Sequence, residues 1–466
     1  VYTDNLPLNF DTLDFVSFLK GKPILTQSNY SIENTLLVGK ISCYLYESSP
    51  LQIENKKEFI EEEILVTEEI APEEIFPGGI TAKNTWKDDC GGKRNIICIS
   101  STRWDFIRQR PHHLMELSSR RNNRVLFFNH SVAVNYEEAE KKLADPESWE
   151  ERLYKVSESL WVFSPVHVLA ENSGMNKDSL RYFNFRLKEE ALRYLIYKLQ
   201  FYDPIIISYL AESINYIKEL PRKILCYDCI DEFSAFSWSE EGIEEDEEDL
   251  IREADLVITS AERLYKRIKK INQNTFLLPN AVEHEHFAAI HRKAQPGKKP
   301  VIGFIGAFYE WIDEELIEYL ARMRKDWKFY FIGPVQPGMS INLRKLENVR
   351  FFGTRNYKEL PRFLQLMDVC IIPFKQNRVT ESANPIKLWE YMASGKPIVS
   401  TPIPEVKKFA DIVYIGETKE EFLYKLSEAL REDSDKLARK RIAVARRNDW
   451  NHRVEKLLKI IEDHEK

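Results

Sequence analysis

The chain has 466 residues, of which 43% are hydrophobic and 30% are charged, and its formal net charge is −7. This length exceeds what one hydrophobic core usually supports, so we expect two or three domains. The acidic balance argues against nucleic acid as the main partner, because phosphate backbones bind basic surfaces.

No apolar run approaches the roughly 18 residues needed to span a bilayer, and no signal-peptide pattern is visible. The six cysteines are scattered, and Cys98, Cys226 and Cys370 lie inside apolar, strand-like runs. This distribution fits a reducing compartment better than a disulfide framework. We therefore predict a cytoplasmic protein without a transmembrane segment, and leave open a peripheral contact with the inner face of the membrane.

Residues 1–92 differ in pattern from the rest of the chain. They contain weak strand-like runs, followed by the acidic stretch ENKKEFIEEEILVTEEIAPEEIF. Acidic stretches of this kind are usually solvated helices or tethers. We interpret this region as an N-terminal appendage with an acidic tether, and assign no chemistry to it.

From residue 93 onward, short apolar runs alternate with longer amphipathic stretches. This alternation predicts parallel sheets covered by helices on both faces. A polar, proline-bounded stretch interrupts the series and is interpreted as a linker. The predicted fold class is α/β, with two doubly wound Rossmann-like domains facing a cleft, and the predicted parts are 93–290, the linker 291–299, 300–440 and a terminal helix at 441–466.

Charged and aromatic side chains crowd the loop after the first predicted strand, in the stretch TRWDFIRQRP. Trp104, Asp105, Arg108 and Arg110 are the candidates for ligand contacts in this loop. The alternative is a simple helix start, with Asp105 as the capping residue. The adjacent histidines His112 and His113 point in different directions and make a poor metal pair, so we predict no metal there.

Two aspartates follow the predicted strand ILCY, at its carboxyl end. Such a position faces the ligand side of a doubly wound sheet. Asp228 or Asp231 could therefore serve as a general base, although a capping or hydrogen-bonding role is equally open. Cys226 and Cys229 form a CxxC pair in the same stretch, which we interpret as two strand residues because no second pair lies at a zinc-site spacing.

Glycines mark the end of the first predicted strand after the linker, in VIGFIGAFYEW. Gly303 and Gly306 would let the backbone approach a phosphate closely, although a tight turn alone explains the same spacing. Asp313 is expected to cap the helix that follows, with Glu314 and Glu315 in its first turn.

The stretch NPIKLWEYMASGKPIVST, residues 384–401, predicts a helix, a tight turn and a strand. Asn384 is expected to cap the helix, with Pro385 at its first position. Lys387 then falls in the first turn, where a cation is unfavourable unless an anion binds there too. Glu390 lies on the same face, where a carboxylate can accept hydrogen bonds from ribose hydroxyls. The alternative is an amphipathic helix on which Lys387 and Glu390 pair at the surface.

The segment ESANPIKLWEYMASGKPIVST resembles the nucleotide-sugar motif of GT-B glycosyltransferases of the retaining family 4 type, nearest to the teichuronic-acid glycosyltransferase subgroup. VIGFIGAFYEWIDEELIEYLA, ENVRFFGTRNYKELPRFLQLMDVCIIPF and SSTRWDFIRQRPHHLMELSSRRNNRVLFFN resemble other segments of that subgroup, in the same order. The resemblance spans about residues 94–460.

The resemblance implies a role for each candidate. It makes 93–290 the acceptor domain and 300–440 the donor domain, and implies that the terminal helix crosses back to the first domain. The implied donor-binding residues are Gly306, Ala307, Gly353, Thr354, Asn384, Pro385, Lys387 and Glu390. The implied acceptor-binding residues are Trp104, Asp105, Arg108 and Arg110, and the catalytic candidates are Asp228 and Asp231.

One departure from the family pattern concerns the sugar end of the donor segment. Many family members place two glutamates eight positions apart, whereas the position eight before Glu390 is Ser382, with Glu381 one residue away. The donor-sugar contact of that first glutamate therefore carries over to Glu381 less well than the roles of Lys387 and Glu390.

We predict an enzyme that moves a sugar from a nucleoside-diphosphate sugar, with UDP favoured, to a saccharide or lipid-linked glycan acceptor in surface polysaccharide synthesis. It is expected to be a hexosyltransferase, retaining by resemblance, that needs no cofactor and no metal. The alternatives are a nucleotide-sugar epimerase of GT-B fold, or a non-catalytic carbohydrate-binding scaffold with a degenerate donor site.

Overall fold

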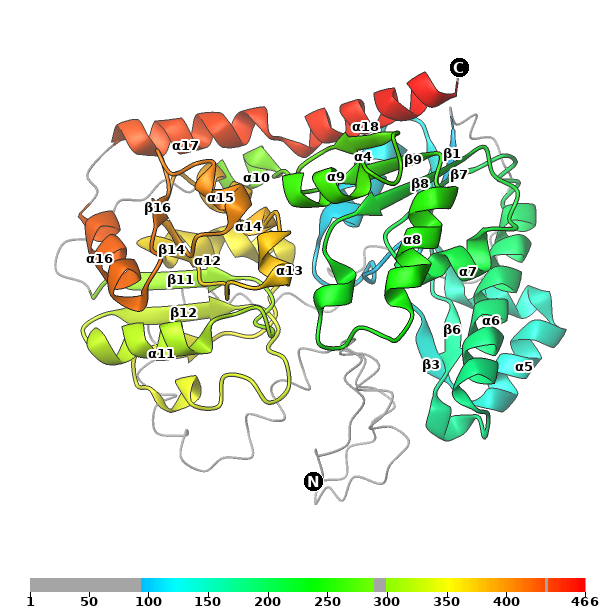
Figure 1. Ribbon diagram of the computed structural model, residues 1–466, viewed down its shortest axis with the longest axis horizontal. Helices are drawn as coiled ribbons and strands as arrows, with labels where there is room; N and C mark the ends of the chain where they lie inside the picture. Colours follow the sequence, from blue (N-terminus) through cyan, green and yellow to red (C-terminus); the bar gives the residue numbers. More distant parts are fainter. Residues whose placement is uncertain (1–93, 289–298, 432–434, 466) are drawn as a thin grey trace. The chain divides into compact units, whose positions relative to one another are not determined.

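The computed structural model describes residues 94–288, 299–431 and 435–465, all of which belong to one compact unit. The predicted appendage at 1–92 and nearly all of the predicted linker lie outside the described residues. Two large sheets, each flanked by helices, organise the described chain (Figure 1). The α/β class and the doubly wound arrangement are confirmed.

The first sheet has eight strands in the order β10-β9-β8-β7-β1-β2-β5-β4, and only β4 runs antiparallel to its neighbour. β3 and β6 form a separate parallel pair. The bounds are β1 (Asn95–Ile99), β2 (Arg124–Phe128), β3 (Val132–Val134), β4 (Leu153–Ser157), β5 (Leu160–Phe163), β6 (Val166–Val168), β7 (Ile205–Ser208), β8 (Ile224–Cys229), β9 (Leu256–Thr259) and β10 (Thr275–Leu277).

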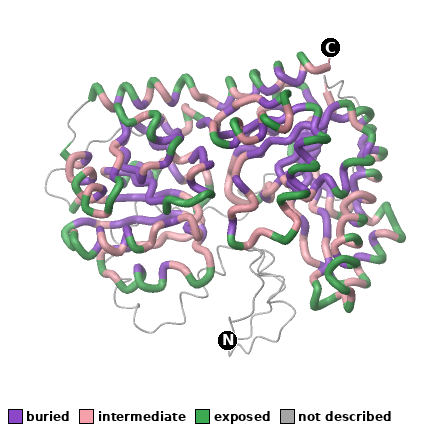
Figure 2. The backbone as a smooth tube through the Cα atoms, in the orientation of Figure 1, coloured by how far each residue is buried: buried purple, intermediate pink, exposed green. Residues whose placement is uncertain are grey.

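Helices connect these strands, as parallel neighbours require. They are α4 (Arg110–Ser119), α5 (Tyr136–Ala144), α6 (Lys177–Lys198), α7 (Ile214–Ile217), α8 (Ile243–Glu253), α9 (Glu262–Ile268) and α10 (His284–Ala288). The strands at the sheet centre are buried along most of their length, whereas the outer helices alternate between buried and exposed residues (Figure 2). This contrast explains why the strand sequences are continuous apolar runs.

The second sheet has six parallel strands in the order β13-β12-β11-β14-β15-β16. This is the Rossmann order, in which successive strands are added on one side of β11 up to β13 and on its other side from β14 onward. Its strands are β11 (Val301–Ile305), β12 (Lys328–Ile332), β13 (Val349–Phe351), β14 (Val369–Ile372), β15 (Ile398–Ser400) and β16 (Tyr414–Ile415). Its helices are α11 (Glu314–Met323), α12 (Leu360–Leu366), α13 (Arg378–Glu381), α14 (Ile386–Ala393), α15 (Pro404–Lys407), α16 (Lys419–Leu430) and α17 (Asp435–Arg447).

Local sequence signals explain these helices. The carboxylate of Asp313 accepts a hydrogen bond from the backbone N–H of Leu316 at 2.9 Å, so its predicted capping role is confirmed. Leu316, Ile317 and Leu320 then form the buried stripe of α11. We refer to the parts that contain the first and second sheets as the first and second domains.

The last two helices link the two domains. α17 packs against α14 of the second domain, and α18 (Trp450–His464) packs against α4 of the first (Figure 1). Trp450, Val454 and Leu457 of α18 belong to the same hydrophobic core as the strands of the first sheet. Residues near the carboxyl terminus of the chain therefore complete the hydrophobic core of the first domain, and this packing fixes α18 to that domain.

Candidate functional site

Three glycines follow neighbouring strands of the second sheet at their carboxyl ends. Gly306 comes after β11, Gly333 after β12 and Gly353 after β13, each with positive φ. The backbone N–H of Gly306 donates to Ile332, and that of Gly333 donates to Gly353 at 2.8 Å. A Cβ on Gly333 would lie 2.1 Å from the carbonyl oxygen of Gly306, so these loops touch backbone to backbone. These hydrogen bonds take the N–H groups of Gly306 and Gly333, and the close packing leaves no room for a side chain at Gly333.

Gly303 has a different role. It lies inside β11, and a Cβ there would fall 2.2 Å from the sulfur of Met367. The residue is a glycine because the Met367 side chain packs on the strand at this point. The expected approach of Gly303 to a phosphate is therefore not what the structure shows, whereas Gly306 does lie at the strand end.

Lys387 in the first turn of α14 reaches toward this glycine edge. A Cβ on Gly306 would lie 3.5 Å from the Cε atom of Lys387. The Lys387 ammonium donates a hydrogen bond to Glu390 at 2.8 Å, and the two side chains are only 15% and 3% exposed. The pairing that the alternative interpretation expected is present, but it is not at the surface. A mostly buried lysine beside a helix start and the closely packed glycine loops is a competent anion site.

The start of α14 corrects one prediction. The helix begins at Ile386 with Pro385 as the capping position, and no side chain caps it. The Asn384 amide oxygen accepts a hydrogen bond from the Trp389 indole at 3.1 Å, and its amide nitrogen donates to Glu405 at 3.2 Å. Asn384 therefore cannot cap the helix, because these two partners hold its side chain.

The loop after Gly353 and Thr354 leads to Tyr357, whose ring stacks on His286 with centroids 4.5 Å apart. The His286 ring also hydrogen-bonds the Tyr357 carbonyl at 2.9 Å. The guanidinium of Arg108, from the first domain, lies over the Tyr357 ring, 5.4 Å from its centroid. Burial, with the nearby Glu390 charge, raises the pKa of Tyr357 well above its ordinary value. Arg108 thus contacts the second domain's loop.

The other residues of the TRWDFIRQRP loop are fixed within the first domain. Trp104 packs on His112 and edge-on against Phe127. Asp105 pairs with Arg103 at 3.2 Å, so it does not cap α4. Gln109 occupies the capping position instead.

Arg110 and Asp228 form an ion pair at 2.8 Å, and their side chains are 1% and 0% exposed. Arg110 also donates to the carbonyl of Leu278 at 2.9 Å and to the side chain of Asn280 at 3.2 Å. Buried charges need such partners because an isolated one is costly. The pair is sealed from solvent, which leaves neither side chain open to a substrate in this structure.

Asp231 is placed differently, in the loop after β8 near the second domain. The residue is half-buried, and desolvation of its carboxyl group raises its pKa to about 7. A carboxyl group with a pKa near neutrality can accept or donate a proton at physiological pH. Of the two predicted catalytic aspartates, Asp231 therefore has the environment that suits proton transfer.

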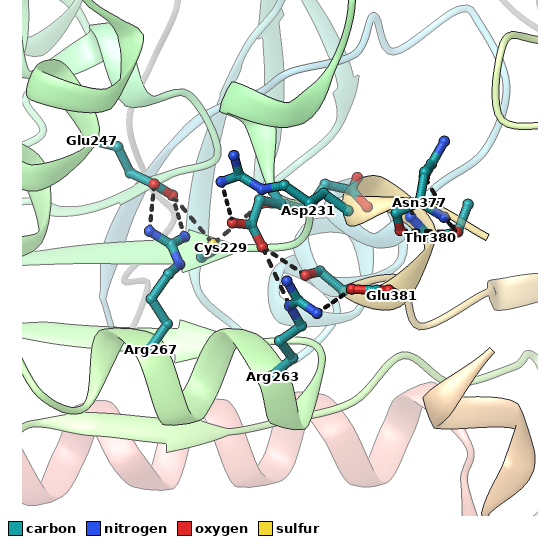
Figure 3. A network of polar contacts seen from close by, with 11 residues as sticks. Cys229, Asp231, Glu247, Arg263, Arg267, Asn377, Thr380 and Glu381 are labelled. Carbon is teal, nitrogen blue, oxygen red and sulfur yellow. Dashed lines mark hydrogen bonds and ion pairs between the residues drawn. The ribbon is translucent and has the colours of Figure 1, made fainter. Parts of the chain in front are cut away.

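A polar network next to Asp231 joins the two domains (Figure 3). Glu232 accepts hydrogen bonds from Arg378 at 3.0 Å and from the Ser382 hydroxyl at 2.7 Å. Arg263 on α9 pairs with Glu381 on α13. Sequence reasoning had no signal for Glu232, Arg263 or Arg378, because their partners are more than 100 residues away.

The described parts of the chain contain neither a candidate metal-ion cluster nor a disulfide. No group of three His, Cys, Asp or Glu side chains there is arranged to hold a metal ion. Cys98, Cys226, Cys229 and Cys370 are free and buried, and burial raises the pKa of each thiol. The interpretation of Cys226 and Cys229 as strand residues is confirmed. No helix within the described ranges is long and apolar enough to cross a membrane.

Residues 299–440 match the family of group 1 glycosyl transferases. The TuaH protein of Bacillus subtilis (strain 168), named as a teichuronic acid biosynthesis glycosyltransferase, is 29% identical over 228 residues. That alignment covers 45% of this chain and 57% of TuaH, so the chain matches little more than half of this relative's length.

Solved structures share the fold at low identity. Sucrose-phosphate synthase from Thermosynechococcus elongatus superimposes with a TM-score of 0.61 at 14% identity, over 80% of this chain and 99% of that one. A trehalose-6-phosphate protein from E. coli bound with UDP-2-fluoro glucose gives 0.58 at 12%, with the same coverage. HepE from Anabaena, in complex with UDP and glucose, gives 0.55 at 13%, over 79% and 100%. The GT-B fold is thereby confirmed. The resemblance to family 4 type glycosyltransferases is confirmed by the match to group 1 glycosyl transferases and by TuaH.

Proposed function

We propose that this chain is a glycosyltransferase that moves a hexose from a nucleoside-diphosphate sugar, preferably a UDP-sugar, to a saccharide or lipid-linked glycan. The group 1 glycosyl transferase domain and the named function of TuaH support the reaction class and a role in surface polysaccharide synthesis. Two structural relatives that bind UDP compounds support UDP as the nucleotide. A cytoplasmic location at the inner face of the membrane is part of the proposal.

The observation that carries it is the Lys387–Glu390 pair, whose lysine lies against Gly306 at the carboxyl end of the second sheet. The diphosphate would lie against the backbone at Gly306 and Ala307, where the Lys387 ammonium offsets its charge. Glu390 would accept hydrogen bonds from the ribose, and the loop at Gly353 and Thr354 would border the base. Because Lys387 and backbone groups supply this electrostatic stabilisation, the proposal needs no metal ion.

The first domain would hold the acceptor. Trp104, Asp105 and Arg108 lie in its loop, and Arg108 already reaches the second domain at Tyr357. In transfer, the bond between the sugar's anomeric carbon and the diphosphate oxygen breaks, and a bond to the acceptor oxygen forms. In a retaining reaction the leaving diphosphate takes the acceptor's proton, whereas Asp231 could take it in an inverting one.

The first experiment is calorimetric titration of UDP and GDP into wild type and Lys387→Ala. Losing a charged hydrogen bond should cost about 1.5–3 kcal/mol, which is roughly tenfold or more in affinity for UDP. Uridine, which lacks phosphate, should bind both proteins equally.

Lys425→Ala is the matched control. Lys425 makes the same i,i+3 pair with Glu428 at 2.8 Å, but on α16, and its loss should leave UDP binding unchanged. Absence of binding of either nucleotide to the folded wild type would refute the proposed donor site. Nucleotide binding without any consumption of UDP-sugar in the presence of saccharide acceptors would instead favour the scaffold.

A further inference from the structure

Glu232 follows Asp231 directly in the first domain, yet its side chain is hydrogen-bonded to residues of the second domain. Its two carboxylate oxygens accept separate hydrogen bonds, from Arg378 at 3.0 Å and from Ser382 at 2.7 Å. Arg263 of the first domain lies 3.9 Å from the same carboxylate. The Glu232 side chain is 7% exposed and Ser382 is fully buried. The hydrogen bonds and Arg378 lower the pKa of Glu232 against the opposing effect of burial, so it stays ionised.

Glu232 lies between two arginines, Arg263 of the first domain and Arg378 of the second. Arg263 contacts both Glu232 and Glu381, while Arg378 contacts Glu232. Figure 3 shows Arg263 directed at Glu381 next to the loop that carries Asp231. Exposed ion pairs contribute little, but a buried carboxylate with fixed partners defines one arrangement and disfavours others.

A second contact reaches the same short stretch of the second domain. The side-chain amide of Asn280 donates to the backbone carbonyl of Asn384 at 2.7 Å, and both residues are buried. Asn280 is itself held by Arg110, the partner of Asp228. Both contacts therefore end within residues 378–384, just ahead of α14 with Lys387 and Glu390.

We propose that Glu232 is a positioning residue that holds the Asp231 loop of the first domain on residues 378–384 of the second. This inference rests on the proposed function, because it links the donor helix α14 to Asp231, the candidate proton acceptor of an inverting transfer. Nucleotide bound at α14 then restrains the Asp231 loop through Glu232. Asp231 would be placed for chemistry only while the two domains are joined there.

Hydrogen exchange by mass spectrometry, with and without UDP, tests this inference on wild type and Glu232→Gln. Without nucleotide, the substitution should speed exchange at least fivefold in both 230–236 and 378–384. UDP should slow exchange of 230–236 severalfold in wild type. In Glu232→Gln, UDP should bind within about threefold of the wild-type affinity but no longer slow exchange of that loop.

Glu247→Gln is the matched control. Glu247 is also a buried carboxylate, paired with Arg267 at 2.8 Å, but both residues belong to the first domain (Figure 3). Its loss should speed exchange around α8 and α9 while leaving the UDP-dependent slowing of 230–236 intact. A purely structural role for Glu232 would likewise leave the UDP-dependent slowing of 230–236 intact in Glu232→Gln.

The outcomes separate the two proposals. If wild type binds no UDP, the proposed function fails, and the nucleotide-free exchange of 230–236 and 378–384 still decides whether Glu232 joins them. If UDP binds but slows the loop equally in wild type and Glu232→Gln, the positioning role is overturned while the donor site stands. Unchanged nucleotide-free exchange in Glu232→Gln also overturns it.

Discussion

Acidic side chains lie at the carboxyl end of β8 in the first sheet, whereas β11, β12 and β13 of the second sheet are followed by glycines. Asp228 lies within β8 and is sealed in an ion pair with Arg110, and in the loop after the strand Glu232 contacts Ser382 of the other domain. After β11, β12 and β13, backbone meets backbone. An edge of peptide groups with one lysine suits a diphosphate, while an edge of carboxylates and arginines suits hydroxyl groups and domain contacts.

The largest effect is expected from breaking the sealed pair of the first sheet. Asp228→Ala leaves Arg110 buried without its counter-charge, which should lower the free energy of unfolding by about 3–5 kcal/mol. Urea denaturation measures this. Glu248→Ala, which removes an exposed i,i+4 pair with Arg252, should cost no more than about 0.5 kcal/mol. If Asp228→Ala lowered the free energy of unfolding by no more than Glu248→Ala, the Arg110–Asp228 pair would be solvated and not sealed.

The next effect concerns the glycine edge. Gly333→Ala combines a positive φ with a Cβ only 2.1 Å from a backbone oxygen, so overpacking of about 1–3 kcal/mol adds to backbone strain. Gly338→Ala has positive φ but nothing within 4 Å, and should show the strain alone. Thermal unfolding and UDP titration of both variants compare them. Equal losses of stability and unchanged UDP affinity would contradict the close packing at this edge.

The smallest effect is a pH dependence at Asp231. Its folded-state pKa of about 7 lies above the ordinary value of 3.8, so the folded protein holds the proton more tightly. Stability contributed by this proton is present at low pH and is lost as pH rises toward 7. Asp231→Asn should therefore gain up to about 3 kcal/mol relative to wild type between pH 4.5 and 7.5, and less to the extent that water reaches the half-buried carboxyl, measured by urea denaturation.

Asp326 provides the control for that measurement. Arg324 lowers the pKa of Asp326, so its replacement by asparagine should give no such gain over the same pH range. Parallel pH profiles for wild type and Asp231→Asn would show that the Asp231 carboxyl is solvated like an ordinary aspartate.

The amino-acid sequence by itself determined the two α/β domains, the glycine at the end of β11 and the segment with Lys387 and Glu390. These follow from local pattern: apolar runs alternate with amphipathic stretches, glycines occur where positive φ is required, and i,i+3 spacing places two side chains on one helix face. The family resemblance also pointed to the segment with Lys387 and Glu390, because the residues of that motif are contiguous in the sequence.

Only the tertiary structure decided what Asp228, Arg110, Asn384 and Glu232 do. Asn384 stands where a helix cap is expected, but Trp389 and Glu405 take its side chain. Asp228 and Asp231 are three residues apart, yet one is sealed by Arg110 and the other is half-buried with a raised pKa. These differences depend on partners distant in sequence, because burial and charge at a site are set by whichever elements pack around it, and no local pattern encodes that.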